Sequence, residues 1–261
     1  MLSLDIAATG MLAQQMNVDV ISNNIANMTT TGFKRQRAEF QDLIYQNKAT
    51  PGVTSSSTGS VLPSGIQLGL GVKPGSVYRI NEQGTISMTG NTYDIAIAGR
   101  GWFQINMPDG SIGYTRDGTF AINADGQLVN PQGYTVEPNI TIPADAHSVN
   151  ISDDGVVTVN IAGQTTTTQV GQLQLATFQN DAGLEAVGNN ILLETAASGS
   201  PTVGNPTDVG FGKLQQGAKE SSNVNVVDEI TSMITAQRSY EMNSKVVQTS
   251  DDMLGTLTQL R

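Results

Sequence analysis

The sequence contains no cysteine among its 261 residues. This absence excludes disulfides, thiol catalysis and thiolate metal sites. Charge is also scarce, because Asp, Glu, Lys and Arg make up only 14% of the chain, and the formal net charge is -10. A chain this acidic repels phosphate, so we expect no nucleic-acid partner and no attraction to anionic membranes. No apolar run approaches the roughly 20 residues of a membrane-spanning helix, so we expect no membrane insertion.

The N-terminal segment also lacks the features of a cleavable secretion signal. It has no basic region, and Asp5 and the pair Gln14–Gln15 interrupt any apolar core. If the protein leaves the cytoplasm, we expect a route that keeps the N-terminus.

Both ends of the chain are predicted to be long helices. Near the N-terminus, apolar residues alternate at spacings of three and four, the heptad pattern of a helix that packs along another helix. Near the C-terminus, apolar residues recur every seven positions from Val226 to Leu254, in a predicted helix of about residues 224–260. Ser221, Ser222 and Asn223 offer a choice of residues that could cap its start.

The C-terminal helix is too long for the N-terminal one to cover, so we expect part of its apolar surface to contact other chains. Periodicity alone is equally consistent with terminal helices that pack onto the domain of their own chain. The residues predicted to pack between subunits are Leu4, Met11, Val18, Ile21, Ile25, Met28, Val226, Ile230, Met233, Tyr240, Val247 and Leu254.

The middle of the chain shows no sustained helical period. Short apolar runs alternate with turn signals such as Asp109–Gly110 and Asp117–Gly118, which are typical of β-hairpins because type I′ turns require positive φ. The predicted fold class is therefore α+β: long N- and C-terminal α-helices pair as a coiled coil, with a central all-β domain inserted between them.

Segments rich in Ser, Thr and Gly suggest the domain boundaries, because they bury too little apolar surface to fold alone. We expect a terminal helix pair, a connecting region and an outer β-domain. Their predicted ranges are 1–30 with 220–261 for the helices, 31–75 with 205–219 for the connecting region, including an extended hairpin or linker at 46–63, and 76–204 for the β-domain.

Residues that could carry chemistry are few. The single histidine, His147, has no cysteine to complete a usual zinc site. The Asp-Gly pairs match no EF-hand, the glycine pairs match no phosphate loop, and no Gly-x-Ser-x-Gly motif occurs. We therefore predict no catalytic, metal-binding or cofactor-binding residues and no cofactor, so the chain is not expected to be an enzyme.

Several motifs resemble those of flagellar rod and hook proteins. Ser22–Asn27 and Thr31–Arg35 are similar to the N-terminal signature of that family, and Ser222–Val226 and Gln237–Lys245 to its C-terminal one. Segments near Gly99–Phe103 and Tyr114–Gly118 also look like its central motifs. The family-motif residues are Asn23, Asn24, Asn27, Gly32, Phe33, Lys34, Gln237, Arg238, Tyr240, Glu241 and Asn243.

The resemblance implies a structural subunit of the flagellar distal rod, because the chain length and the segment from Tyr45 to Pro63 suit that part of the flagellum. Such subunits would polymerise into a hollow helical drive shaft that transmits torque from motor to hook. The implied location is the basal body, where the rod crosses the periplasm after type III export without cleavage. The implied partners are further copies of the chain, proximal rod proteins, the hook protein, the surrounding ring proteins and the export apparatus.

Two other interpretations stay open. The chain resembles proximal rod and hook-type subunits less closely, and a secreted β-domain adhesin or binding protein is the alternative from another class. A further hypothesis concerns residues 46–63, which neighbouring subunits would order into a rod-stiffening segment anchored by Val53, Val61 and Leu62.

Overall fold

The computed structural model describes residues 2–49, 65–162 and 166–259. Its α-helices are α1 (Leu2–Ala26) and α2 (Val226–Gln259), and a short 3-10 helix, η1, spans Asp181–Gly183. The strands are β1 (Gln36–Asp42), β2 (Tyr45–Ala49), β3 (Ile66–Gly69), β4 (Val72–Arg79), β5 (Ile86–Met88), β6 (Ile95–Ala98), β7 (Phe103–Asn106), β8 (Ile112–Thr115), β9 (Ala121–Ile122), β10 (Leu128–Val129), β11 (Val136–Glu137), β12 (Ala146–Ile151), β13 (Val156–Ile161), β14 (Thr168–Gln172), β15 (Leu175–Thr177), β16 (Glu185–Gly188), β17 (Ile191–Leu193), β18 (Thr202–Gly204), β19 (Lys213–Gln216) and β20 (Ala218–Glu220). An N-terminal helix, a central β-rich region and a C-terminal helix confirm the predicted α+β class.

The chain divides into two compact units. The first unit combines Met1–Ile25, Gln36–Tyr78 and Asn225–Arg261, and the second combines Ala26–Arg35 and Arg79–Val224. Each unit is therefore built from segments that are distant in sequence. Among the described residues, no helix has the length and apolar character needed to cross a membrane.

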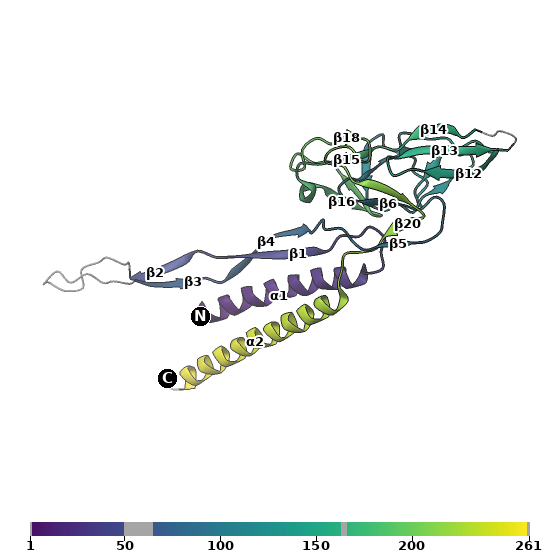
Figure 1. Cartoon of the computed structure of the whole chain (residues 1–261). Coiled ribbons are helices and arrows are strands. Elements are labelled where there is room, and N and C mark those ends of the chain that lie inside the picture. The colour runs from purple at the N-terminus through teal and green to yellow at the C-terminus, as the bar shows by residue number, and fades with distance from the viewer. Residues whose placement is uncertain (1, 50–64, 163–165, 260–261) are drawn as a thin grey trace. The chain divides into compact units, whose positions relative to one another are not determined.

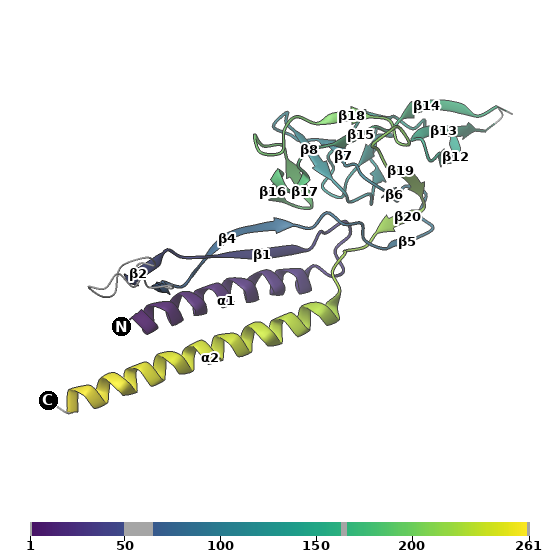
Figure 2. The same ribbon diagram turned by 60° about the vertical axis from the view of Figure 1, so that its left-hand side comes forward.

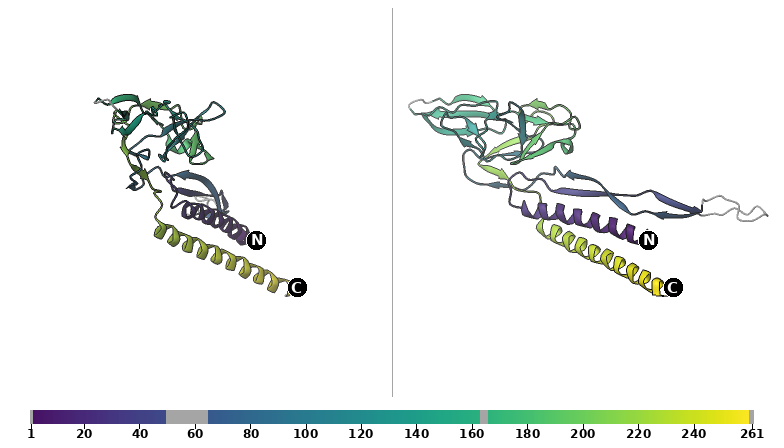
Figure 3. Two further views of the ribbon diagram at one scale, coloured as in Figure 1. Left: turned by 90° about the vertical axis from the view of Figure 1, so that its right-hand side faces the viewer. Right: turned by 180° about the vertical axis from the view of Figure 1, so that it is seen from behind.

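The first unit has three layers. A long β-ribbon, made of β1 with β4 and continued by β2 with β3, lies along α1, and α2 lies on the other side of α1 (Figures 1 and 2). The views from the side and from behind show the same order of layers (Figure 3). The two helices run antiparallel, so that both termini lie at one end of this unit (Figure 1).

The ribbon approaches α1 closely at Gly71. This residue has a φ of +117°, and a Cβ at this position would collide with the Thr9 side chain. The Val72 amide donates a hydrogen bond to the Thr9 hydroxyl, at 3.4 Å. Glycine at position 71 thus permits contact between ribbon and helix.

Helix α2 begins at an asparagine cap. The Asn225 side-chain oxygen accepts a hydrogen bond from the Val227 amide at 3.1 Å, and the Asn225 carbonyl accepts one from the Glu229 amide at 3.0 Å. This is the geometry of an N-cap residue. The cap therefore lies two to four residues beyond the candidates that the sequence suggested.

The second unit contains a five-stranded sheet in the order β11-β7-β8-β17-β16 and a three-stranded sheet, β12-β13-β14. Strand β6 pairs with β19, and β5 pairs with β20, so the first strands of this unit are joined to its last ones. Residues 213–219, assigned from sequence to the connecting region, thus contribute strands to this unit.

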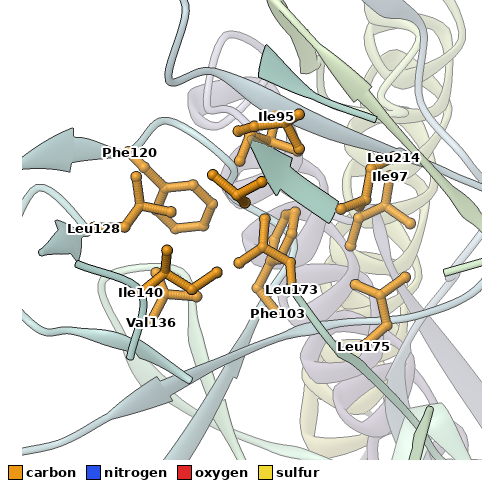
Figure 4. Packing of buried hydrophobic residues seen from close by; sticks show 12 residues of the cluster. Ile95, Ile97, Phe103, Phe120, Leu128, Val136, Ile140, Leu173, Leu175 and Leu214 are labelled. Carbon is orange, nitrogen blue, oxygen red and sulfur yellow. The ribbon is translucent and has the colours of Figure 1, made fainter. Parts of the chain in front are cut away.

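The core of the second unit contains two apolar clusters, of which the larger surrounds Phe103. Phe103 and Phe120 meet edge to face with ring centroids 5.0 Å apart, and Ile95, Leu173 and Leu214 surround them (Figure 4). Each such buried side chain contributes roughly 1.5–3 kcal/mol relative to an exposed one. This core gives the second unit an independent source of stability.

Candidate functional site

Small side chains of α1 meet polar side chains of α2 at two points near the start of α1. The Ser3 and Ser250 hydroxyls are hydrogen-bonded at 3.3 Å. At Gly10, an added Cβ would lie 2.8 Å from Nδ2 of Asn243. Small side chains therefore let the helices approach each other at these points.

At the other end of the helix pair, Asn24 links three elements. Its side chain is 1% exposed. Its Oδ1 accepts a hydrogen bond from the Gln36 amide and its Nδ2 donates to the Gln36 carbonyl, both at 2.8 Å. The same Nδ2 donates to Oε2 of Glu229 at 3.2 Å. Asn24 thus connects the end of α1 to the start of β1 and to the first turn of α2.

A buried ion cluster occupies the second unit, where Glu220 lies between two cations. The Lys34 Nζ is 2.6 Å from Oε1 of Glu220, and the Arg116 Nε is 2.8 Å from its Oε2. None of these side chains is more than 6% exposed. Arg116 also donates to the carbonyls of Gly99 and Gly101 at 2.7–2.9 Å. The excess positive charge is therefore compensated by backbone dipoles.

Burial and pairing act in opposite directions on this cluster. Burial by itself would raise the pKa of the Glu220 carboxyl, but Arg116 and Lys34 outweigh it and hold that pKa below its usual range. Burial lowers the pKa of the Lys34 ammonium, and the neighbouring Glu220 opposes that change. The carboxylate is thus the group that binds both cations in place.

Gly32 lets the segment before Lys34 lie close to the backbone of this cluster. Gly32 has a φ of +69°, and a Cβ there would lie 2.9 Å from the Arg116 carbonyl carbon. Its amide donates to the Glu220 carbonyl at 2.9 Å. The segment before Lys34 therefore packs directly on the backbone at Arg116.

Comparison with known proteins gives matches along the whole chain. Three family models match the chain: "Flagella basal body rod protein" at residues 4–34, "Flagellar hook protein FlgE/F/G D1 domain" at 96–159, and "Flagellar basal body rod FlgEFG protein C-terminal" at 215–260. The flagellar basal-body rod protein FlgG of Caulobacter vibrioides is 56% identical over the whole of both chains. Those of Agrobacterium fabrum and of Buchnera aphidicola from Acyrthosiphon pisum are 51% identical, over 99% of each chain.

The chain belongs to the flagellar basal-body rod protein family. It is a structural protein of the rod and not an enzyme, as the sequence predicted. Among the described residues there is also no group of three or more His, Asp or Glu side chains that could hold a metal ion.

The predicted packing residues of this rod protein differ in burial. In α1, Ile21 is buried and the other predicted positions are half-buried, whereas Met28 lies beyond the helix and is 42% exposed. In α2, Ile230 is 46% and Tyr240 44% exposed. Half-buried positions are Leu4, Met11, Val18, Ile25, Val226, Met233, Val247 and Leu254.

The family-motif residues are likewise divided between interior and surface. Asn24 and Lys34 are buried, and Asn27 accepts a hydrogen bond from the Thr30 hydroxyl at 3.1 Å. The exposed members, which contribute surface rather than core, are Asn23, Gln237, Arg238, Tyr240 and Glu241. The half-buried members are Asn27, Gly32, Phe33 and Asn243.

Some residues of these sites had no signal in the sequence. Glu220 and Glu229 look like ordinary surface acids, and only the tertiary structure brings them against Lys34 and Asn24. Asn24 is a family-motif residue, but the motif does not indicate that its side chain contacts α2. The proposed stiffening residues Val53, Val61 and Leu62 lie outside the described residues.

Proposed function

We propose that this structural subunit of the flagellar distal rod polymerises through its terminal helices into a hollow helical drive shaft that transmits torque from motor to hook. The observation that carries the proposal is apolar surface on α2 that α1 leaves uncovered. Exposed large apolar side chains recur along the helix: Val227, Ile230, Ile234, Tyr240, Met242, Val246 and Met253. Such a surface on a soluble chain is typical of a protein interface.

We also infer that α1 and α2 pair as an antiparallel coiled coil. Ser3, Gly10 and Asn24 face Ser250, Asn243 and Glu229, respectively. In both helices these positions are separated by seven and then fourteen residues. A constant register with heptad spacing supports this pairing.

The subunits of a shaft need contacts that repeat without closing into a ring. One side of α2 is taken by α1, so the exposed side is available for a neighbouring copy. Burial of each exposed Ile or Met would contribute roughly 1.5–3 kcal/mol, enough for a stable array when repeated along the helix.

The proposed location is the basal body, with the rod crossing the periplasm after type III export without cleavage. The proposed partners are the proximal rod proteins, the hook protein, the surrounding ring proteins and the export apparatus. Membership of the rod family supports assembly with other basal-body proteins.

The stiffening hypothesis for residues 46–63 is supported by the strands around it. Tyr45 pairs with Gly69 and Asn47 with Gln67, so β2 and β3 bring the two flanks of the segment together. We propose that the segment bridges neighbouring subunits and blocks the sliding that would let the rod bend. Deletion of residues 46–63 is expected to give curved rods in electron micrographs, and straight rods would contradict the bridge.

Electron microscopy of the purified full-length chain tests the main proposal. We expect tubular or filamentous polymers at high protein concentration. A chain that stays monomeric, and that fails to restore rods to cells lacking their own rod subunit, would contradict it.

A further inference from the structure

The chain crosses between its two units four times, after Ile25, Arg35, Tyr78 and Val224. Three of these crossings lie next to segments that are hydrogen-bonded to one another within the second unit. These neighbouring segments are Gly32–Arg35, residues 80–84 and residues 220–223.

Asn223 binds both of the other segments. Its Oδ1 accepts a hydrogen bond from the Arg35 amide at 2.7 Å. Its Nδ2 donates to the carbonyls of Ile80 and Glu82 at 2.9 and 3.1 Å. The Ile80 amide in turn donates to the Arg35 carbonyl at 2.8 Å.

Glu220 repeats the same connections three residues earlier. Its Oε1 accepts from Lys34 at 2.6 Å and from the Gly84 amide at 2.8 Å. The Lys34 ammonium also donates to the Glu82 carbonyl at 2.7 Å. Two side chains of one segment thus each hold the other two segments.

Stability alone does not explain why these three segments are joined by buried polar and charged groups. A buried set of two cations and one anion is commonly replaceable by apolar side chains without loss of stability. Hydrogen bonds to charged groups and to backbone are directional, however, and apolar packing is not. The polar groups therefore fix the spacing of three segments in a way that an apolar core would not.

We propose that Asn223 and Glu220 are positioning residues for assembly. Their hydrogen bonds keep the three segments next to the chain crossings side by side, so that the segments share the torque. This inference rests on the proposed function. In a rod under torque, the chain crossings transmit force between the units. Segments that are hydrogen-bonded side by side resist this force together, whereas unconnected segments would extend one at a time.

Asn223→Ala in the full-length chain tests the inference, with Asn130→Ala as the matched control. Asn130 is buried in the same unit, and its Oδ1 accepts from the Gln132 and Tyr134 amides at 3.1 and 2.8 Å within one turn. Both variants lose side-chain hydrogen bonds to backbone, but only Asn223→Ala releases the crossings. Asn223→Asp keeps the acceptor for Arg35 but turns a carboxylate oxygen toward the Ile80 and Glu82 carbonyls, so this second variant should disrupt the junction at least as much as Asn223→Ala.

The first measurement is hydrogen exchange of backbone amides in the full-length chain. The second is electron microscopy of rods from cells complemented with each variant. We expect the Arg35 amide to exchange about tenfold faster in Asn223→Ala, the size of one lost hydrogen bond, and to be unchanged in Asn130→Ala. Rods of Asn223→Ala and of Asn223→Asp are expected to be short or broken, and those of Asn130→Ala normal.

The outcomes separate the two proposals. If the wild-type chain restores no rods, the proposed function fails and this inference fails with it. If the wild-type chain restores rods and those of Asn223→Ala match those of Asn130→Ala, only the positioning role is overturned.

Discussion

Gly32 has a backbone conformation that L side chains rarely adopt, and it also lies against other backbone. Gly90 has a similar φ, +75°, but an added Cβ there would meet nothing within 4 Å. Gly90→Ala is thus expected to cost about 1 kcal/mol from conformation alone. Gly32→Ala adds a steric clash with the backbone at Arg116, so we expect a loss of about 2–4 kcal/mol by urea unfolding. Equal losses would show that the close approach at Gly32 has no energetic effect.

The Glu220 carboxyl makes stability of the second unit depend on pH. Its pKa in the folded chain is lowered by Arg116 and Lys34, below the value of about 4.3 for an unfolded chain. The stabilising contribution is therefore fully present above that value and is lost as the pH falls through the folded-state pKa.

Glu220→Gln tests this linkage by urea unfolding between pH 7 and pH 3. At pH 7 we expect a loss of about 3–5 kcal/mol, because two buried cations lose their partner. The variant should then lose less stability than the wild type as the pH falls. Glu185→Gln, at an exposed position in β16, should keep the pH dependence of the wild type. A Glu220→Gln profile parallel to the wild type would contradict the assignment.

At the scale of elements, α2 presents exposed apolar side chains that the single chain does not use. Ile234→Asp is expected to leave the folded chain intact, since Ile234 is 46% exposed, and to abolish polymers, because the charge would be buried without a partner in the assembly. Circular dichroism and electron microscopy measure the two effects. Ile112→Asp, at a residue 41% exposed in β8, is the control that should polymerise normally. Polymers of Ile234→Asp would place this side chain outside the interface.

Helix α1 has an extent that its sequence predicts and contacts that its sequence does not predict. Its apolar heptads predict a helix within residues 1–30, and α1 spans Leu2–Ala26. The seam is different, because the contacts lie at Ser3, Gly10 and Asn24, whose side chains are small or polar. A hydrophobicity pattern cannot identify contacts that small or polar side chains make.

At the scale of the whole molecule, the two units have separate stabilising contacts. The apolar cluster around Phe103 belongs wholly to the second unit, together with Ala26–Arg35 and its ion cluster. Deletion of residues 1–25 should therefore abolish polymers and leave the second unit folded, with its near-ultraviolet circular dichroism and thermal transition retained. A longer deletion through residue 34 should also remove Lys34 and lower that transition. Polymers of the shorter variant would contradict assembly through the helices.

The sequence by itself determined the α+β class, the terminal helices, the turn-rich middle and the rod family, because periodicity, turn residues and motifs are local properties of the chain. The tertiary structure alone decided which polar residues meet. Glu220 and Lys34 lie 186 residues apart, and Asn24 and Glu229 lie 205 apart. Such pairs exist only in the tertiary structure, because no local pattern encodes which residues that far apart in the sequence become neighbours.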